Sequence, residues 1–338
     1  MKRSASGEAG VTGKRRHRRW LWFAIPLALV FLFYATIGFL ATTVMVGNNS
    51  RWRGISKGPA DFGLSGEAVS FPATDGVPIK AWWLPAAAPA RGTVIVAPSG
   101  EYTRQVLLPR AAFLVHGGYN VLDFDLRGHG ESGGDFISPG LVEKRDVLGA
   151  IRYVRSRGER EPIVLMGVCG GGVASLFAAA ESPDVRAVIS DSAYLSGYDV
   201  FRNLRDYFLR DPAQSKGQIG IANTRSPVVR AIAVASYTPG IVSSVVLVYY
   251  VRTGVWLGFD LVSVLPAAAR VSVPVMIISG EADWIVPPSA SRRIFDAVPG
   301  AHKRFLGIPN AGHDGGYSTA PDLYRDAVLN FLDGSLAR

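Results

Sequence analysis

Cysteine is nearly absent from this chain, since Cys169 is the only thiol among 338 residues. An intramolecular disulfide needs two thiols, so no such bridge can stabilise the fold, and cysteine usage does not indicate a redox compartment. With 48% hydrophobic and 19% charged residues, the composition is that of a globular chain with one large core and an accessory segment.

Charge is sparse outside the first 19 residues. Residues 1–19 hold seven Lys and Arg against Glu8, which accounts for +6 of the formal net charge of +9. The remaining +3 is ordinary for a surface of this size, and basic residues do not alternate with aromatic ones downstream. The sequence therefore does not indicate a nucleic-acid partner. We expect residues 1–19 to form a basic cytoplasmic tail beside a membrane.

Residues 20–46 contain no charged residue at all. Roughly 20 apolar residues are enough to cross a bilayer, so this segment is expected to be a transmembrane anchor. A cleavable signal peptide is the alternative, but its apolar region would be shorter. Basic residues are concentrated before the segment. The positive-inside rule therefore predicts a single-pass membrane protein with a cytoplasmic N-terminus and the main domain outside.

A tether and an alternating α/β domain are expected after the anchor. Residues 47–66 have the Gly-, Ser- and Asn-rich composition of a linker, and the folded domain is expected to span 67–338. Short apolar runs predict buried strands at 93–97, 120–124, 163–167, 187–190, 275–279 and 304–308. Helical patterns lie between them, at 109–116, 141–157, 173–180 and 289–297. This alternation predicts a mostly parallel sheet with helices on both faces, preceded by an antiparallel hairpin at 68–84.

An insertion interrupts the alternation between about residues 194 and 270. Residues 231–251 carry no charge, so a second membrane span is one alternative. Pro239 and Gly240 would break such a helix, and a second crossing would separate the last strands of the sheet from the first ones. We favour a helical lid over an apolar pocket and leave open whether it touches the membrane surface.

The strongest chemical signal is the segment Gly167-Val168-Cys169-Gly170-Gly171, which follows a hydrophobic strand and precedes a run of small residues. A strand, a sharp turn and a helix form the context of a nucleophile elbow, whose glycines let strand and helix approach closely. The thiol of Cys169 would then stand at the carboxyl edge of the sheet. Unpaired amides at the helix N-terminus are expected to lower the pKa of this thiol.

Two other interpretations of this turn compete with a nucleophile. Free cysteine is among the residue types most often buried, so Cys169 could simply fill space in the core. Glycine-rich turns also bind nucleotides, but the G-x-G-x-x-G spacing and an acidic ribose partner are both missing here. The elbow remains the favoured interpretation.

A cysteine nucleophile needs a base and an acid that orients it. Among the five histidines, His313 is the candidate base, because it follows the last strand in a loop at the carboxyl edge of the sheet. The others lie in the tail, inside a helix, in a Gly-rich turn and before a strand: His17, His116, His129 and His302.

The acid is expected at a strand end between nucleophile and base in the chain. Asp283 directly follows the strand at 275–279 and is the candidate. Its neighbour Glu281 and the earlier Asp191, which ends the strand at 187–190, are the competitors.

Several motifs together give the chain from about residue 68 to 336 a family resemblance. Besides the elbow, Asp125-Leu126-Arg127-Gly128-His129-Gly130-Glu131-Ser132 resembles the D-x-R-G-x-G-x-S turn of the α/β-hydrolase superfamily. The segments 280–287 and 310–313 resemble its acid and histidine loops. The chain is similar in particular to bacterial serine-aminopeptidase-like and acyl-hydrolase members with an N-terminal anchor. The resemblance implies an α/β-hydrolase fold with Cys169 as nucleophile, His313 as base and Asp283 as its orienter.

The chain departs from this family at two places. The usual His-Gly that shapes the oxyanion hole is replaced by Pro98-Ser99-Gly100-Glu101-Tyr102, so we expect the backbone N–H of Glu101 or Tyr102 to act together with that of Gly170. Cys169 stands where most relatives have serine, although dienelactone hydrolases of the superfamily use a Cys-His-Asp set.

These expectations lead to one favoured function and two alternative functions. We expect a membrane-anchored hydrolase of an ester, thioester or lactone bond, with a covalent acyl-enzyme and without a metal or cofactor. Its partner would be a small-molecule or lipid-like acyl substrate. An acyltransferase or peptidase on the same fold is the nearest alternative, and a catalytically inactive, membrane-tethered binding protein is the other.

Overall fold

The computed structural model describes residues 12–43, 54–87, 89–100, 102–138, 140–209, 239–255 and 263–337. Five expectations from the sequence lie partly or wholly outside this range. They concern the tail before residue 12, the end of the anchor at 44–46, the tether up to residue 53, Glu101, and residues 210–238 and 256–262 of the insertion.

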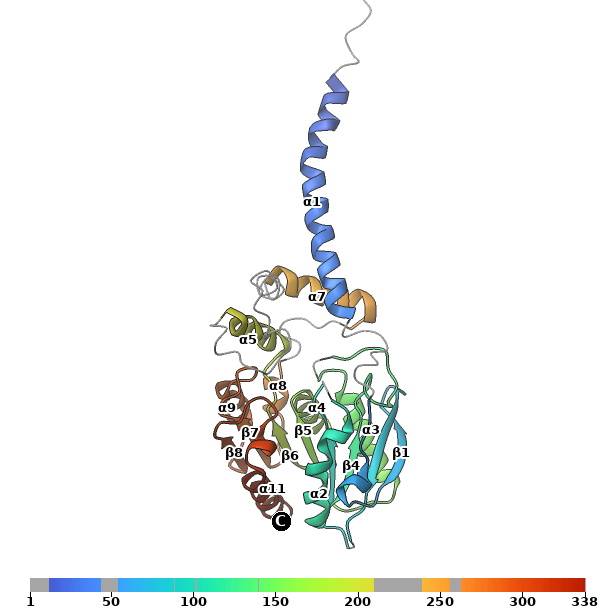
Figure 1. The fold of residues 1–338 in the computed structure, drawn as a ribbon, viewed down its shortest axis with the longest axis vertical. Coiled ribbons are helices and arrows are strands. Elements are labelled where there is room, and N and C mark those ends of the chain that lie inside the picture. The colour runs from blue at the N-terminus through green and yellow to red at the C-terminus, as the bar shows by residue number, and fades with distance from the viewer. Residues whose placement is uncertain are drawn as a thin grey trace, which may run out of the picture.

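One eight-stranded sheet forms the centre of the domain (Figure 1). Its strands, in chain order, are β1 Glu67–Pro72, β2 Pro78–Leu84, β3 Thr93–Ala97, β4 Asn120–Phe124, β5 Ile163–Val168, β6 Val185–Asp191, β7 Val275–Gly280 and β8 Lys303–Ile308. The spatial order is β1-β2-β4-β3-β5-β6-β7-β8. β1 and β2 pair antiparallel with each other, β2 pairs antiparallel with β4, and all other pairs are parallel. The predicted hairpin and mostly parallel sheet are therefore confirmed.

Helices cover both faces of this sheet. α2 Leu108–His116 and α11 Pro321–Leu336 contribute to one apolar core, and α3 Lys144–Ser156, α4 Gly170–Ala179, α8 Leu265–Ala268 and α9 Pro288–Ala297 to the other. The short elements are η2 Pro59–Phe62, η3 Arg104–Leu107 and α10 Gly316–Thr319. β3, β4, β5 and β7 are buried along their whole length, because helices lie above and below them.

The register of the parallel strands brings their carboxyl ends to one edge. Gly167 of β5 pairs with Ser190 of β6, which pairs with Ile277 of β7. The residues that follow these strands therefore share the edge where ligands bind in open α/β sheets. This edge is also where the chain of the insertion leaves β6.

The N-terminal helix α1, Thr12–Thr43, extends away from the domain (Figure 1). Its segment Trp20–Leu40 is the one candidate membrane span among the described residues, by length and composition. Within the insertion, α5 Gly197–Leu209 follows β6 and α7 Pro239–Thr253 packs on α1. α7 begins at Pro239, where the sequence predicted a break, and its 15 residues are shorter than a span. The rest of the alternative second span, residues 231–238, lies outside the described range.

Candidate active site

The elbow between β5 and α4 holds Cys169 in a strained conformation. Its φ of 50° and ψ of −114° lie in a region that side-chain-bearing residues rarely adopt, at a cost of about 1–3 kcal/mol. A side chain on Gly167 would collide with the carbonyl of Gly171, and one on Gly171 with the carbonyl of Ala97. The glycines on either side of Cys169 are thus required by close backbone packing. The helix starts at Gly170 rather than at the predicted Val173, because the turn leads directly into it.

His313 joins Cys169 to Asp283. Its Nε2 lies 3.3 Å from the Cys169 Sγ, and its Nδ1 lies 2.8 Å from Asp283 Oδ2. The other carboxylate oxygen of Asp283 accepts the amide N–H groups of Ile285 and Val286, at 2.9 and 2.8 Å. These backbone bonds fix the carboxylate, which in turn fixes the imidazole ring. The structure therefore brings together the three side chains that the sequence singled out.

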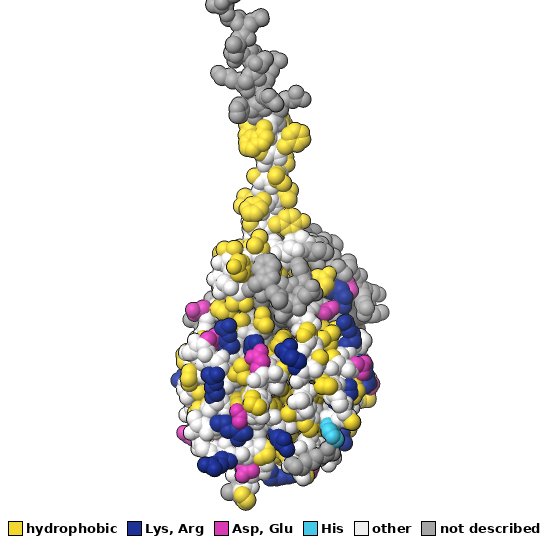
Figure 2. Space-filling view, turned by 180° about the vertical axis from the view of Figure 1, so that it is seen from behind, with side chains coloured by type: hydrophobic (Ala, Val, Ile, Leu, Met, Phe, Trp, Pro, Cys, Tyr) yellow, Lys and Arg dark blue, Asp and Glu magenta, His cyan; other side chains and the backbone are white. Residues whose placement is uncertain are grey.

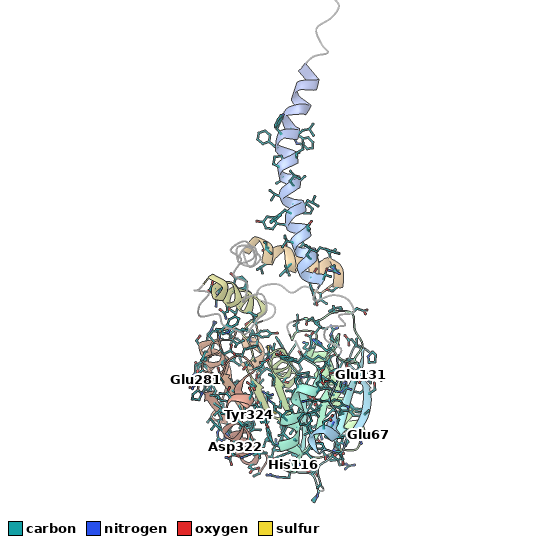
Figure 3. The ribbon with its side chains drawn as sticks, viewed as in Figure 1. Glu67, His116, Glu131, Glu281, Asp322 and Tyr324 are labelled. Atoms are coloured by element: carbon teal, nitrogen blue, oxygen red, sulfur yellow. The ribbon has the colours of Figure 1, made fainter. Side chains whose placement is uncertain are left out.

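The two competing acids lie elsewhere. Asp191 Oδ2 accepts a hydrogen bond from the hydroxyl of Tyr324 at 2.8 Å and lies 3.6 Å from Arg110 Nη2. Asp191 is thus held by a buried polar cluster. Glu281 is exposed at the periphery of the domain (Figure 3). His116 is exposed near the end of the domain opposite α1 (Figure 3), and His302 is exposed as well.

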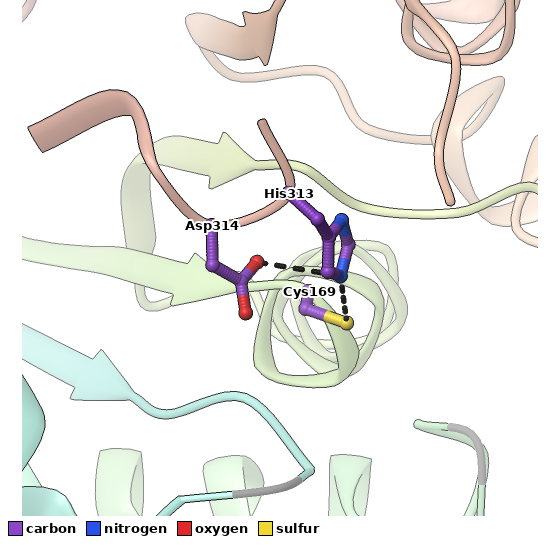
Figure 4. A group of neighbouring side chains, drawn as sticks. All are labelled: Cys169, His313 and Asp314. Carbon is purple, nitrogen blue, oxygen red and sulfur yellow. Dashed lines mark hydrogen bonds and ion pairs between the residues drawn. The ribbon is translucent and has the colours of Figure 1, made fainter. Parts of the chain in front are cut away.

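Asp314 is a second carboxylate beside His313 that sequence reasoning missed. Its Oδ1 lies 3.5 Å from the same Nε2 that faces Cys169 (Figure 4). This oxygen is buried and accepts no hydrogen bond from the described residues. Burial raises the pKa of Asp314 to about 6, although the nearby His313 acts in the opposite direction. Its position immediately after His313 in the chain was the one available signal.

The electrostatics of the thiol differ from the expectation based on the helix N-terminus alone. Burial raises the pKa of the Cys169 thiol, and the neighbouring His313 offsets this effect only in part. For His313, burial lowers the pKa, but Cys169, Asp314 and Asp283 outweigh it and raise the pKa well above its usual value. The predicted lowering of the thiol pKa was therefore wrong. Burial instead disfavours a free thiolate, and Asp314 and Asp283 favour the protonated form of His313.

The loop after β3 faces the elbow from the other side. A side chain on Gly170 would lie 3.5 Å from the backbone nitrogen of Gly100, so these two backbone segments are adjacent. The N–H of Tyr102, one of the expected oxyanion donors, donates to the carbonyl of Ser99 at 3.2 Å. Glu101, the other expected donor, lies outside the described residues. Gly100, which sequence reasoning did not select, thus comes closest to Gly170 among the described residues of this loop.

His129, which the sequence excluded only as the catalytic base, fixes the position of this loop. Its Nε2 lies 2.7 Å from the carbonyl oxygen of Gly100, and its Nδ1 lies 2.8 Å from that of Arg127. The turn that carries it is itself fixed, because the buried Arg127 donates to Asp146 at 2.6 Å and to Asp75 at 2.8 Å. The motif at 125–132 therefore supports the site without touching Cys169.

Thiol, imidazole and carboxylate are also the ligand types of zinc. The Cys169 Sγ, a ring nitrogen of His313 and a carboxylate oxygen of Asp314 lie within 4.8 Å of one another (Figure 4). Because His313 Nε2 already faces Sγ at hydrogen-bond distance, a metal ion would have to displace that bond. Metal binding would thus compete with the pairing of Cys169 and His313.

Comparison with known families identifies the class of this protein. A family model described as alpha/beta hydrolase fold matches residues 99–318. The chain therefore belongs to the α/β-hydrolase family. Among curated proteins it is similar to the uncharacterized protein YfhR of Escherichia coli K12, with 26% identity over 284 residues, covering 80% of this chain and 82% of YfhR. It is also similar to the uncharacterized protein Rv2307c of Mycobacterium tuberculosis, with 23% identity and 79% of each chain covered.

Solved structures show the same fold. The esterase Pf2001 of Pyrococcus furiosus superposes with a TM-score of 0.67 at 20% identity, covering 86% of this chain and 98% of the esterase. An enol-lactonase of Burkholderia xenovorans LB400 gives a TM-score of 0.54 at 19% identity, covering 78% of this chain and 99% of the lactonase. At such identities the likeness establishes the fold only, and the reaction has to be argued from the residues of the site.

Proposed function

We propose that this protein is a membrane-anchored hydrolase that cleaves an ester, thioester or lactone bond through Cys169, His313 and Asp283. The observation that carries the proposal is the hydrogen-bonded connection from Cys169 Sγ through His313 to Asp283, with Cys169 on a strained elbow. The solved esterase and enol-lactonase of the same fold support this class of bond. Trp20–Leu40 of α1 supports the anchor.

The contacts among the three side chains support a general-base mechanism. Since burial disfavours a free thiolate, the Sγ of Cys169 attacks the substrate carbonyl as His313 Nε2 takes its proton. The backbone N–H of Gly170 and one from the loop 99–102 are proposed to hold the oxyanion. When the tetrahedral intermediate collapses, the protonated His313 gives its proton to the leaving alcohol or thiol. Water then attacks the thioester with His313 as base, which releases the carboxylic acid and restores Cys169.

The direct test is a screen of short p-nitrophenyl esters and thioesters with the full-length protein in detergent. We expect turnover by the wild type and none above background by Cys169→Ala. Turnover that survives Cys169→Ala unchanged would exclude Cys169 as nucleophile. Labelling by iodoacetamide provides a second measurement. Rapid, His313-dependent labelling of Cys169 without turnover would mean that the thiol is reactive and that the substrate class is wrong.

A further inference from the structure

α7 lies between α1 and the hydrolase domain, at the end of α1 nearest the domain (Figure 1). Its residues, Pro239–Thr253, include no acidic residue and a single basic one, Arg252. A helix that is apolar on all sides needs apolar surroundings on all sides, from either protein or lipid. We therefore ask what surrounds each of three sides of α7: the side toward the domain, the side toward α1 and the exposed side.

One side of α7 packs against the domain. Its fully buried Tyr249 forms an apolar cluster with Phe136 and Leu141 of the domain, and Ile241, Val242, Val245 and Val246 are buried on the same half of the helix. The hydroxyl of Tyr249 donates to the carbonyl of Ile137 at 2.6 Å, and its ring packs edge-to-face against Phe136. The loop that holds these two residues continues to the elbow, because a side chain on Gly140 would lie 3.1 Å from the carbonyl of Gly170. α7 thus rests on a loop that borders the site.

A second side of α7 is fitted to α1. Small residues allow the two helices to approach closely, since a side chain on Gly38 would collide with Ser244 and one on Gly240 would press on Tyr34. At the other end, Arg252 Nη1 lies 3.3 Å from the carbonyl of Phe39 and caps the last turn of α1. α1 and α7 are therefore one packed unit.

The third side of α7 is exposed. Leu247, Tyr250 and Val251 expose 50%, 46% and 75% of their surface. Successive residues of a helix differ by about 100° in direction, so these three side chains lie roughly opposite the buried side and beside the α1-facing one. The exposed apolar side therefore flanks the place where α1 leaves the domain. Figure 2 shows hydrophobic side chains along α1 and at its junction with the domain, whereas charged ones lie on the body of the domain.

We propose that this exposed side of α7 lies in the interfacial layer of the bilayer that α1 crosses. The inference rests on the proposed membrane anchor. Tyr34 and Gly38, which contact α7, belong to the last turns of the candidate span Trp20–Leu40. α7 is thus level with the end of the span, where interfacial helices are buried by about 5–10 Å. Arg252, in the last turn of α7, places its charge beside Phe39 and Thr42 at the end of α1.

Site-directed fluorescence on the full-length chain tests this proposal. In a Cys169→Ser background, single cysteines are introduced as Leu247→Cys and Val251→Cys and labelled with a polarity-sensitive nitrobenzoxadiazole dye. The protein is reconstituted into vesicles of equal parts phosphatidylcholine and phosphatidylglycerol, with and without nitroxide-labelled lipid. Leu323→Cys on α11, whose side chain is 47% exposed, is the matched control outside the membrane. Phe31→Cys on α1 reports on the anchor itself.

The expected result is a blue-shifted emission at positions 247 and 251 that loses most of its intensity with nitroxide lipid, as at position 31, while position 323 is unaffected. If positions 247 and 251 behave like 323 while 31 is quenched, the anchor stands and the interfacial role of α7 is refuted. A blue shift without quenching would indicate that protein, such as a second copy of the chain, covers α7, which also overturns the proposal. Absence of quenching at position 31 would refute the anchor together with the inference.

Discussion

The imidazole of His129 links the turn after β4 to the loop after β3, with its Nε2 2.7 Å from the carbonyl oxygen of Gly100. Gly100 lies next to the start of α4, where the oxyanion of the proposed reaction would be bound. The side chain of His129 is buried, and each ring nitrogen lies within hydrogen-bond distance of a backbone carbonyl oxygen. His129 is therefore a positioning residue for the loop, which makes its removal informative.

We expect His129→Ala to lower kcat by roughly 10- to 100-fold, because a displacement of about 1 Å in a catalytic group can cost a factor of this size. KM should change far less, since the buried ring is not accessible to a substrate. His116→Ala, at an exposed position on α2, is the matched control. His129→Gln should recover part of the activity by donating to one of the carbonyls. An unchanged kcat in a stably folded His129→Ala protein would contradict the role.

Asp283→Asn tests which carboxylate orients the imidazole. An amide at this position can no longer hold His313 in the tautomer that accepts the thiol proton, and we expect a loss of roughly 10³-fold or more in kcat. Glu281→Gln alters a nearby but exposed carboxylate and should leave kcat unchanged. Comparable losses in both variants would mean that the acid has been assigned to the wrong residue.

Asp314→Asn is expected to shift the pH dependence of activity. Above about pH 6 the ionised Asp314 places a negative charge near His313, and this charge helps to raise the pKa of His313. Since His313 must be unprotonated to accept the thiol proton, kcat/KM rises as the pH passes through the pKa of His313. Removing the charge lowers that pKa, so the rising limb should move to lower pH. The pH profile of Asp322→Asn, a surface substitution on α11, is the reference; coincident profiles would exclude the coupling.

The proposed topology can be measured in cells. An alkaline phosphatase fused after Arg338 is active only outside the cytoplasm, and we expect it to be active. The physical reason is the concentration of basic residues before the candidate span, which by the positive-inside rule is expected to keep the N-terminus in the cytoplasm. A fluorescent protein that folds only in the cytoplasm serves as the reciprocal fusion. Fluorescence from this second fusion with an inactive phosphatase would reverse the orientation.

Local sequence patterns predicted the sheet and the side chains of Cys169, Asp283 and His313. Both depend on the order in which strands, helices and loops follow one another in the chain. The run at 163–167 became β5, Ile163–Val168, and parallel strands with a common carboxyl edge had to bring the loops with Cys169, Asp283 and His313 together. The family resemblance pointed to the same three residues.

Features that depend on contacts between distant loops could not be predicted in this way. His129 meets Gly100 across 29 residues of sequence, and the contact exists only because the loops after β3 and β4 lie side by side. The direction of the shift in the Cys169 pKa depends on burial by several elements that are distant in the sequence. The sequence indicated only the helix N-terminus, which favours a lower pKa. The packing of α7 on α1 likewise depends on small residues that face each other across the two helices, such as Gly38 and Ser244. These residues are far apart in the sequence, so no local pattern predicts their contact.

Gly167→Ala tests whether the elbow depends on close backbone packing. The added methyl group would collide with the carbonyl of Gly171, and we expect the free energy of unfolding to fall by at least about 1–3 kcal/mol, measured by urea denaturation in detergent. Gly334→Ala in α11 is a matched control, because the new methyl group would meet no atom within 4 Å other than those of its chain neighbours and of the adjacent helix backbone. It should stabilise the helix by about 0.5–1 kcal/mol, because alanine loses less backbone entropy on folding than glycine does. Opposite signs for the same chemical change would show that Gly167 is required by packing at the elbow. Equal, small effects would mean that the backbone of the elbow can relax around an added methyl group and that its glycines are not a steric requirement.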